Sequence, residues 1–147
     1  MIYEKLGNSR FDEFFELVTK MVAEAEFCSA KPEVSKIKKM FQMPNVAVFG
    51  AIEDGKLIGF ISGMYNEYFF SSKKKVSDLG FYVLPEFRGT RASIRLIKEL
   101  ENWAVKLGSE DLALGQTTAV NMEKTQKFYE KLGYKTVGFN TIKHLGN

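Results

Sequence analysis

Apolar residues near the start of the chain recur at helical spacing in two segments. A short strand is predicted at residues 3–6, and Ser9 with Asp12 three residues later is a capping signal for the first helix. The apolar positions after this signal fall on one helical face: Phe11, Phe14, Phe15, Val18 and Val22. Pro32 is expected as the first residue of a second short helix, which Pro44 stops.

The pattern then changes to strands. Residues 46–52 are a nearly continuous apolar run rich in β-branched side chains, and residues 57–65 form a second run. Asp54 and Gly55 between them are typical of a tight reversal, so the two runs predict a β-hairpin. The remaining elements are predicted in this order: a polar connection at 71–75, a strand at 76–84 ended by Pro85, a helix at 93–107 closed by Gly108, a strand at 111–115, a helix at 121–132 and a closing strand at 134–143.

The order of elements is strand, helix, helix, three strands, helix, strand, helix, strand. The hairpin is antiparallel, whereas the strand-helix-strand unit from residue 76 to residue 115 requires a parallel crossover. We therefore expect an α/β (α+β) fold with a mixed, mostly antiparallel central sheet flanked by four helices.

Composition fits one globular domain spanning residues 1–147, because 45% of the residues are apolar and no linker or repeat divides the chain. A net charge of +3 is too small for a dedicated nucleic-acid binder and is compatible with an anionic ligand. Cys28 is the only cysteine, so neither a disulfide nor a cysteine-histidine metal site is expected. Without a signal-like or membrane-spanning apolar run, the expected location is the cytoplasm.

The segment at residues 88–93 joins a central strand to a long amphipathic helix. The first N–H groups of a helix have no intrahelical acceptor and carry positive potential, so a turn at this place can bind phosphate. Arg88 and Arg91 add charge, and the small residues Gly89, Ala92 and Ser93 allow close backbone approach. An ordinary turn with solvated charges explains this segment alone equally well.

A second motif further along the chain favours phosphate binding over an ordinary turn for residues 88–93. Residues 83–89 run Val-Leu-Pro-Glu-Phe-Arg-Gly, and Asn121 opens a helix whose end, at residues 127–134, runs Lys-Phe-Tyr-Glu-Lys-Leu-Gly-Tyr. In this order and separation, the two motifs resemble the GNAT acetyltransferase superfamily, and the resemblance covers essentially the whole chain. Arg91 and Ser93 stand where the usual phosphate turn has small residues, which resembles a variant found in bacteriophage-encoded members.

The resemblance implies acetyl-CoA as co-substrate, with no metal. It implies that strand backbone holds the thioester and pantetheine arm and that the turn holds the pyrophosphate. The implied cofactor-binding residues are Phe81, Tyr82, Val83, Arg88, Gly89, Thr90, Arg91, Ala92, Ser93 and Asn121. It also implies that Tyr129 protonates the departing thiolate. Packing is an alternative role for Tyr129, and helix capping for Asn121.

The base that accepts the proton of the attacking amine is less clearly marked. Asp78 on the central strand is the best candidate, although a solvated aspartate at the strand edge explains this residue equally well. Glu67 on the preceding strand competes for the same role. His144 is set aside as a surface residue. Aromatic residues after the hairpin either wall the acceptor pocket or pack in the core: Tyr65, Tyr68, Phe69 and Phe70.

The leading hypothesis is thus an N-acetyltransferase acting on a small-molecule or peptide amine, and the sequence carries no signature of a particular acceptor. Two alternatives stay open: a GNAT-fold protein that binds CoA without turnover, and, less favoured, a nucleic-acid or virion-associated module that uses the lysine clusters at residues 36–39 and 73–75. A membrane partner is not expected, and homodimer formation is left open.

Overall fold

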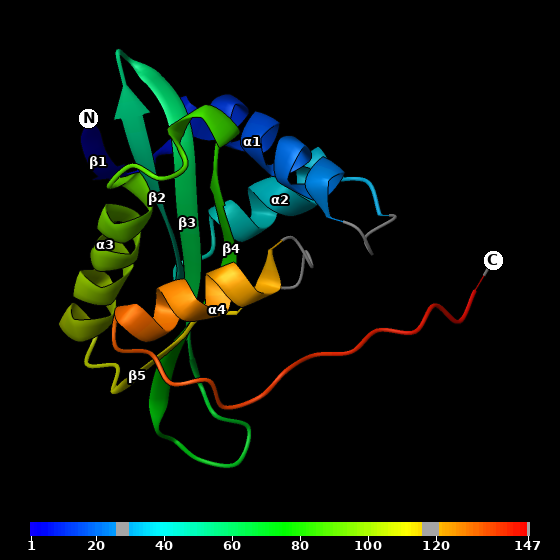
Figure 1. Ribbon diagram of the computed structural model, residues 1–147, viewed down its shortest axis with the longest axis vertical. Helices are drawn as coiled ribbons and strands as arrows, with labels where there is room; N and C mark the ends of the chain where they lie inside the picture. Colours follow the sequence, from blue (N-terminus) through cyan, green and yellow to red (C-terminus); the bar gives the residue numbers. More distant parts are fainter. Residues whose placement is uncertain (26–29, 116–120, 147) are drawn as a thin grey trace.

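The computed structural model describes residues 1–25, 30–115 and 121–146 (Figure 1). Its elements are, in chain order, β1 (Ile2–Lys5), η1 (Asn8–Arg10), α1 (Phe11–Glu24), α2 (Val34–Phe41), β2 (Val46–Glu53), β3 (Lys56–Glu67), β4 (Lys74–Val83), η2 (Pro85–Phe87), α3 (Ala92–Lys106), β5 (Asp111–Ala113) and α4 (Met122–Lys131). None of the described helices is long and apolar enough to cross a lipid bilayer.

The five strands form one sheet in the order β1-β2-β3-β4-β5. All neighbours are antiparallel except β4 and β5, so the predicted mixed sheet is confirmed. The hairpin between β2 and β3 turns at Asp54 and Gly55, which have φ values of 50° and 77°. Two successive residues with positive φ match the right-handed twist of the strands, which explains why this pair of residues predicts the turn correctly.

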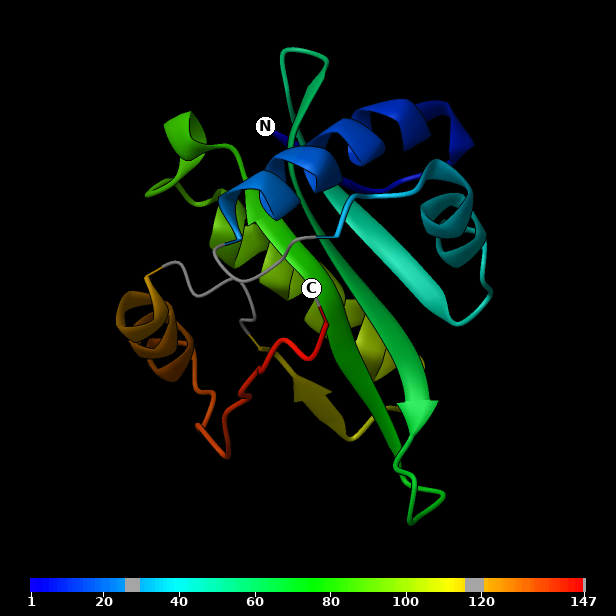
Figure 2. The ribbon, with the colours of Figure 1, turned by 90° about the vertical axis from the view of Figure 1, so that its right-hand side faces the viewer.

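Helices cover both faces of the sheet (Figures 1 and 2): α3 lies on one face, and α1 with α2 on the other. On the α1 face, the Phe14 ring packs edge-on against Phe60 with centroids 4.9 Å apart. On the α3 face, a Cβ added to Gly63 would lie 2.7 Å from Leu100 Cδ1, so glycine allows the helix to pack directly on the strand. These contacts pack β3 between α1 on one face and α3 on the other.

Three predicted boundaries are wrong in detail. Ser9 does not cap α1, because it lies inside the one-turn helix η1 and Arg10 is the N-cap residue. Pro32 precedes α2, whose N-cap is Glu33. The polar residues Lys74 and Lys75 belong to β4, since they pair with β3 in the ladder. In each case, tertiary contacts extend or shift an element beyond its local pattern.

The predicted closing strand at residues 134–143 is also wrong: the structure has no strand in residues 134–146. Tyr134 is fixed beside the helices, since its N–H donates to the Tyr129 carbonyl (3.1 Å) and its hydroxyl to Glu101 of α3 (3.3 Å). After this residue, the chain runs away from the sheet (Figure 1). Alternating apolar residues predict an extended conformation but do not specify which edge it joins.

Candidate active site

A β-bulge interrupts β4 at the place where β5 stops. Gly63 of β3 pairs with Asp78 and Ser62 pairs with Gly80, so Leu79 is an extra residue on β4. The parallel pairing with β5 ends just before the bulge, at Ser77 and Ala113. Beyond this point, β4 has no strand partner on its β5 side among the described residues. Its last residues, including Phe81, Tyr82 and Val83, therefore have one edge available to a ligand.

The backbone of Gly115 joins the two predicted catalytic side chains. Its N–H donates to Asp78 Oδ1 (3.1 Å), and its carbonyl accepts from the Tyr129 hydroxyl (3.4 Å). The first bond also explains why β5 is shorter than predicted, because Gly115 pairs with a side chain instead of the β4 backbone. Asp78 and Tyr129, distant in the sequence, thus lie on either side of one peptide segment.

Both side chains are half-buried, and burial changes their acidity. Burial raises the pKa of Asp78 from 3.8 to about 6, although hydrogen bonds from the N–H groups of Gly115 and of Asp78 itself oppose the shift. Burial, together with the negative charge of Asp78, raises the pKa of Tyr129 well above 10. At neutral pH, the site therefore holds an ionised carboxylate and a protonated phenol.

The turn after β4 has the features of an anion-binding segment. Gly89 has a φ of +84°, and no heavy atom lies within 4 Å of where its Cβ would be. Thr90 stabilises the turn: its hydroxyl donates to the Phe87 carbonyl (2.6 Å) and accepts from the Ala92 N–H (3.2 Å). Ser93 lies in the first turn of α3, where backbone N–H groups have no intrahelical acceptor.

Arg91 is the N-cap residue of α3, with φ −73° and ψ −6°. These angles are ordinary for any residue, so the unusual arginine in the turn introduces no backbone strain. Its side chain is exposed and forms no hydrogen bond or ion pair with the described residues. Of the two arginines in the turn, Arg91 is the one with a free guanidinium.

Arg88 is held by the protein itself. Its Nε donates to the Val83 carbonyl and its Nη2 to Glu24 at the end of α1, both at 2.8 Å. The guanidinium also lies over the Tyr82 ring, 5.2 Å from its centroid. The Tyr82 hydroxyl hydrogen-bonds to Glu24, and burial with this bond raises the pKa of Tyr82 to about 12. Arg88 therefore ties β4 and the turn to α1, and its role as a phosphate ligand stays a prediction.

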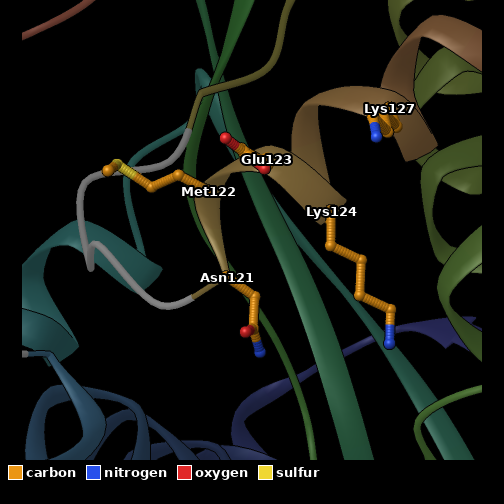
Figure 3. Close-up of a pocket in the computed structure, with 5 residues that line it drawn as sticks. All are labelled: Asn121, Met122, Glu123, Lys124 and Lys127. Atoms are coloured by element: carbon orange, nitrogen blue, oxygen red, sulfur yellow. The ribbon is translucent and has the colours of Figure 1, made fainter.

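Asn121 precedes α4 in a left-handed conformation, with φ 51°. Its side chain makes no capping hydrogen bond, which removes helix capping as the reason for an asparagine here. Figure 3 shows Asn121 and Lys124 extending in the same direction from the start of the helix. The described residues around this open hollow of about 520 Å³ are the N-cap residue and residues of the first half of α4: Asn121, Met122, Glu123, Lys124 and Lys127.

The alternative base and the aromatic residues after the hairpin lie away from the Gly115 segment. Glu67 forms an ion pair with Lys74 at the beginning of β4, before the bulge. Phe69 and Phe70 are 99% and 71% exposed at the tip of the β3–β4 connection, so they do not pack in the core, whereas Tyr65 does pack against it. Tyr68 donates its hydroxyl to Asp111.

Sequence reasoning missed three parts of the site: the Gly115 backbone, the Thr90 hydroxyl as turn stabiliser, and Glu24. Gly115 is the last residue of a predicted strand and Thr90 precedes a predicted helix, and a glycine at a strand end and a threonine before a helix are recognisable signals. No local pattern indicates the bond from Glu24 to Arg88, because it joins residues from separate elements.

The sequence model of the acetyltransferase (GNAT) family matches residues 11–134. The chain belongs to the GNAT family. No curated protein sequence matches it. As a GNAT member, it is an acetyl-CoA-dependent N-acetyltransferase, and the matched region contains Asp78, the turn and Tyr129.

Solved acetyltransferases share the GNAT fold of this chain. An aminoglycoside acetyltransferase from an uncultured soil metagenomic sample is 19% identical, with a TM-score of 0.78 and coverage of 99% of this chain and 96% of that one. A ribosomal-protein-alanine N-acetyltransferase from Brucella melitensis biovar Abortus 2308 is 20% identical, with a TM-score of 0.76 and coverage of 99% and 100%. The aminoglycoside N-acetyltransferase AAC(6')-Iy, solved with CoA, is 19% identical, with a TM-score of 0.77 and coverage of 99% of both chains.

Proposed function

We propose that this GNAT enzyme, one domain over residues 1–147, acetylates a primary amine by direct attack on acetyl-CoA, with Asp78 as base and Tyr129 as acid. The observation that carries this proposal is the Gly115 peptide segment, which hydrogen-bonds to both side chains. A carboxylate with a pKa near 6 and a protonated phenol are suited to accept one proton and to donate another near pH 7.

The turn and the free edge of β4 fit acetyl-CoA. Gly89 leaves the backbone open to a pyrophosphate, the first turn of α3 supplies N–H donors, and Arg91 supplies an unpaired charge. Asn121, with no capping bond of its own, is available from the α4 side. Backbone groups of residues 81–83 would hold the pantetheine arm along β4. The bound thioester supplies the activated acetyl group.

Asp78 accepts the proton that the amine loses as its nitrogen bonds to the acetyl carbon. Tyr129 donates its proton to the CoA sulfur as the carbon-sulfur bond breaks. One proton is gained at Asp78 and one is lost at Tyr129, so a transfer between these neighbouring groups restores both. The Asp78 charge raises the pKa of Tyr129, and protonation of Asp78 therefore makes Tyr129 a stronger acid at the moment when it must donate.

The acceptor is proposed as a small-molecule or peptide amine. The names of similar structures include aminoglycoside and ribosomal-protein-alanine acetyltransferases, whose acceptors are of these two kinds. The single cysteine supports the proposed cytoplasmic location, and the phage-type turn around Arg91 stays a prediction.

Two linked measurements test the proposal. Thermal unfolding with and without acetyl-CoA measures binding, and at about 100 times the dissociation constant the ligand should stabilise the fold by about 2.7 kcal/mol. Release of free thiol is then measured with aminoglycosides, peptides with a free α-amino group and lysine peptides. Stabilisation followed by thiol release with one class supports the proposal and names the acceptor class. Stabilisation with no release from any amine favours CoA binding without turnover, and no stabilisation contradicts both.

A further inference from the structure

The helix α4, which carries Tyr129, is attached to the rest of the chain by side chains. Its backbone hardly approaches the other described elements, and it lies at the side of the molecule (Figure 2). It packs against the core at its C-terminal end, through the half-buried side chains of Phe128, Tyr129 and Leu132. The position of the Tyr129 hydroxyl therefore depends on how this end of α4 is held.

Two hydrogen bonds end α4 and place Tyr134 directly against Tyr129. The Gly133 N–H donates to the Glu130 carbonyl, and the Tyr134 N–H donates to the Tyr129 carbonyl, both at 3.1 Å. With Gly133 at a φ of +95°, this is the Schellman arrangement, in which the residue after the glycine contacts the last turn of the helix. The rings of Tyr134 and Tyr129 accordingly lie with their centroids 6.1 Å apart. Tyr134 is thus fixed to the proposed acid by its backbone and by its ring.

The Tyr134 hydroxyl ties this pair of rings to α3. It donates to Glu101 Oε1 (3.3 Å), and both residues are half-buried. Burial, the negative charge of Glu101 and this bond raise the pKa of Tyr134 well above 10, so the hydroxyl keeps its proton and donates it at neutral pH. Because α3 begins at the phosphate turn, one helix is linked both to the proposed pyrophosphate site and to the proposed acid.

The end of α3 shows that this kind of helix ending does not itself require an aromatic residue. The same Lys-Leu-Gly sequence ends α3 at Gly108, whose φ is also positive (+76°). The residue that follows is Ser109, whose N–H donates to the Ala104 carbonyl (2.9 Å) in the same arrangement. At the corresponding place after α4, Tyr134 adds a ring against Tyr129 and a hydroxyl bound to another helix.

We propose that Tyr134 and Glu101 are positioning residues for the reaction, an inference that rests on the proposed role of Tyr129 as acid. Their bond holds the end of α4 so that the Tyr129 hydroxyl stays at the Gly115 carbonyl. Without it, the end of α4 can move relative to β4, and the proton reaches the CoA sulfur from a poorer geometry. Turnover then falls, whereas acetyl-CoA, which the turn and β4 hold, still binds.

Removal of one partner at a time tests the bond. Tyr134→Phe keeps the ring and removes the hydroxyl, and Glu101→Ala removes the acceptor. Each should lower kcat by about tenfold and change the acetyl-CoA dissociation constant by less than about threefold, and the double variant should lose no more than either alone. Glu101→Gln keeps an acceptor and should recover most of the turnover that Glu101→Ala loses. Glu99→Ala, at another half-buried acid of α3, is the matched control.

Hydrogen exchange of the chain without ligand reports the position of α4 independently of activity. Tyr134→Phe and Glu101→Ala should raise the exchange rate of the α4 amides by about fivefold or more and leave that of β3 unchanged. Glu99→Ala should change neither. Unchanged exchange in α4 would overturn the proposal, as would an equal effect in the Glu99→Ala control.

A Tyr129→Phe background separates this inference from the acid role itself. If Tyr134 acts through Tyr129, Tyr134→Phe should lower kcat no further in that background, and a further loss of about tenfold would overturn the proposal. So would a normal kcat in Tyr134→Phe when Tyr129→Phe is impaired, and the proposed function would then stand. An unimpaired Tyr129→Phe would instead remove the acid from the proposed function, and this inference with it.

Discussion

At the scale of single residues, Asp78 determines the expected pH dependence. Its pKa is raised to about 6 by burial, and it must be ionised to accept the proton of the amine. We expect kcat/KM to rise with pH through about 6 because Asp78 ionises there. Asp78→Asn should lose this rise with pH, and its activity should be lower by about 100-fold or more. Steady-state kinetics from pH 5 to pH 8 checks this. Glu67→Gln is the control, and loss of the rise with pH in that variant instead would assign the base to Glu67.

The same residue should reduce stability when it is ionised. The pKa of Asp78 in the folded chain, about 6, lies above its ordinary value of 3.8, so between these values the folded chain holds a proton that the unfolded chain releases. Stability therefore falls as the pH rises from about 4 to about 6, and it levels off above. Asn can still accept the Gly115 hydrogen bond, so Asp78→Asn should be more stable by about 1–3 kcal/mol at pH 7 and by much less at pH 4. Urea unfolding at the two pH values measures this; a gain that does not depend on pH would contradict it.

Tyr129 should separate turnover from binding. Removing its hydroxyl removes the proton donor but keeps the ring that packs with Phe128 and Tyr134. We expect Tyr129→Phe to lower kcat by about 100-fold, within the usual range for a general acid, and to change acetyl-CoA affinity by less than about threefold. Kinetics and calorimetric titration of one preparation check both values. If affinity collapses while turnover per bound enzyme is unchanged, Tyr129 is a packing residue.

At the scale of elements, one arginine of the phosphate turn should affect stability and the other acetyl-CoA binding. Arg88 joins β4 to α1 through Val83 and Glu24, whereas Arg91 at the start of α3 makes no such contact. Arg88→Ala should lower the free energy of unfolding by about 1–2 kcal/mol. Arg91→Ala should leave it within about 0.5 kcal/mol and weaken acetyl-CoA binding by about fivefold at low salt. Urea unfolding and titration with acetyl-CoA measure the two effects. Tighter binding by Arg91→Ala would mean that the arginine hinders the turn.

Most elements could be predicted because their signals are local. Helical periodicity places α3 between its first apolar residues and Gly108, whose φ of +76° matches the expected left-handed end. The residues that were predicted wrongly depend on distant contacts. Ser9 has the side chain of a cap, but Arg10 and Glu13 bind the β2–β3 turn and set where α1 begins.

In the candidate site too, local features could be predicted from the sequence, whereas contacts between distant residues could not. The turn and the two motifs could be found along the sequence, as could Asp78 and Tyr129 as separate residues. Their approach to Gly115 could not, since it depends on the place where β5 leaves β4. Likewise, the alternation of Val137 and Phe139 predicts a strand without specifying its partner.

At the scale of the whole molecule, the two ends of β4 have different surroundings. The phosphate turn follows its last residue, and the exposed tip with Phe69 and Phe70 precedes its first (Figure 2). The free edge of β5 lies between these ends, and the bulge at Leu79 separates it from the edge proposed for acetyl-CoA. The edge of β5 and the edge of β4 proposed for acetyl-CoA are therefore different stretches of the same side of the sheet.

The exposed segment at residues 135–146 gives a prediction for the thermal stability of the whole chain. A chain ending at Tyr134 loses this segment but keeps the Tyr134 contacts to Tyr129 and Glu101, and the segment adds nothing to the buried core. Its Tm should therefore be close to that of the full chain, and calorimetric scans of both chains check this. Because the proposed acetyl-CoA site contains no residue of this segment, acetyl-CoA should raise the Tm of the two chains equally. An acetyl-CoA shift that is lost on truncation would mean that the segment contributes to the active site instead.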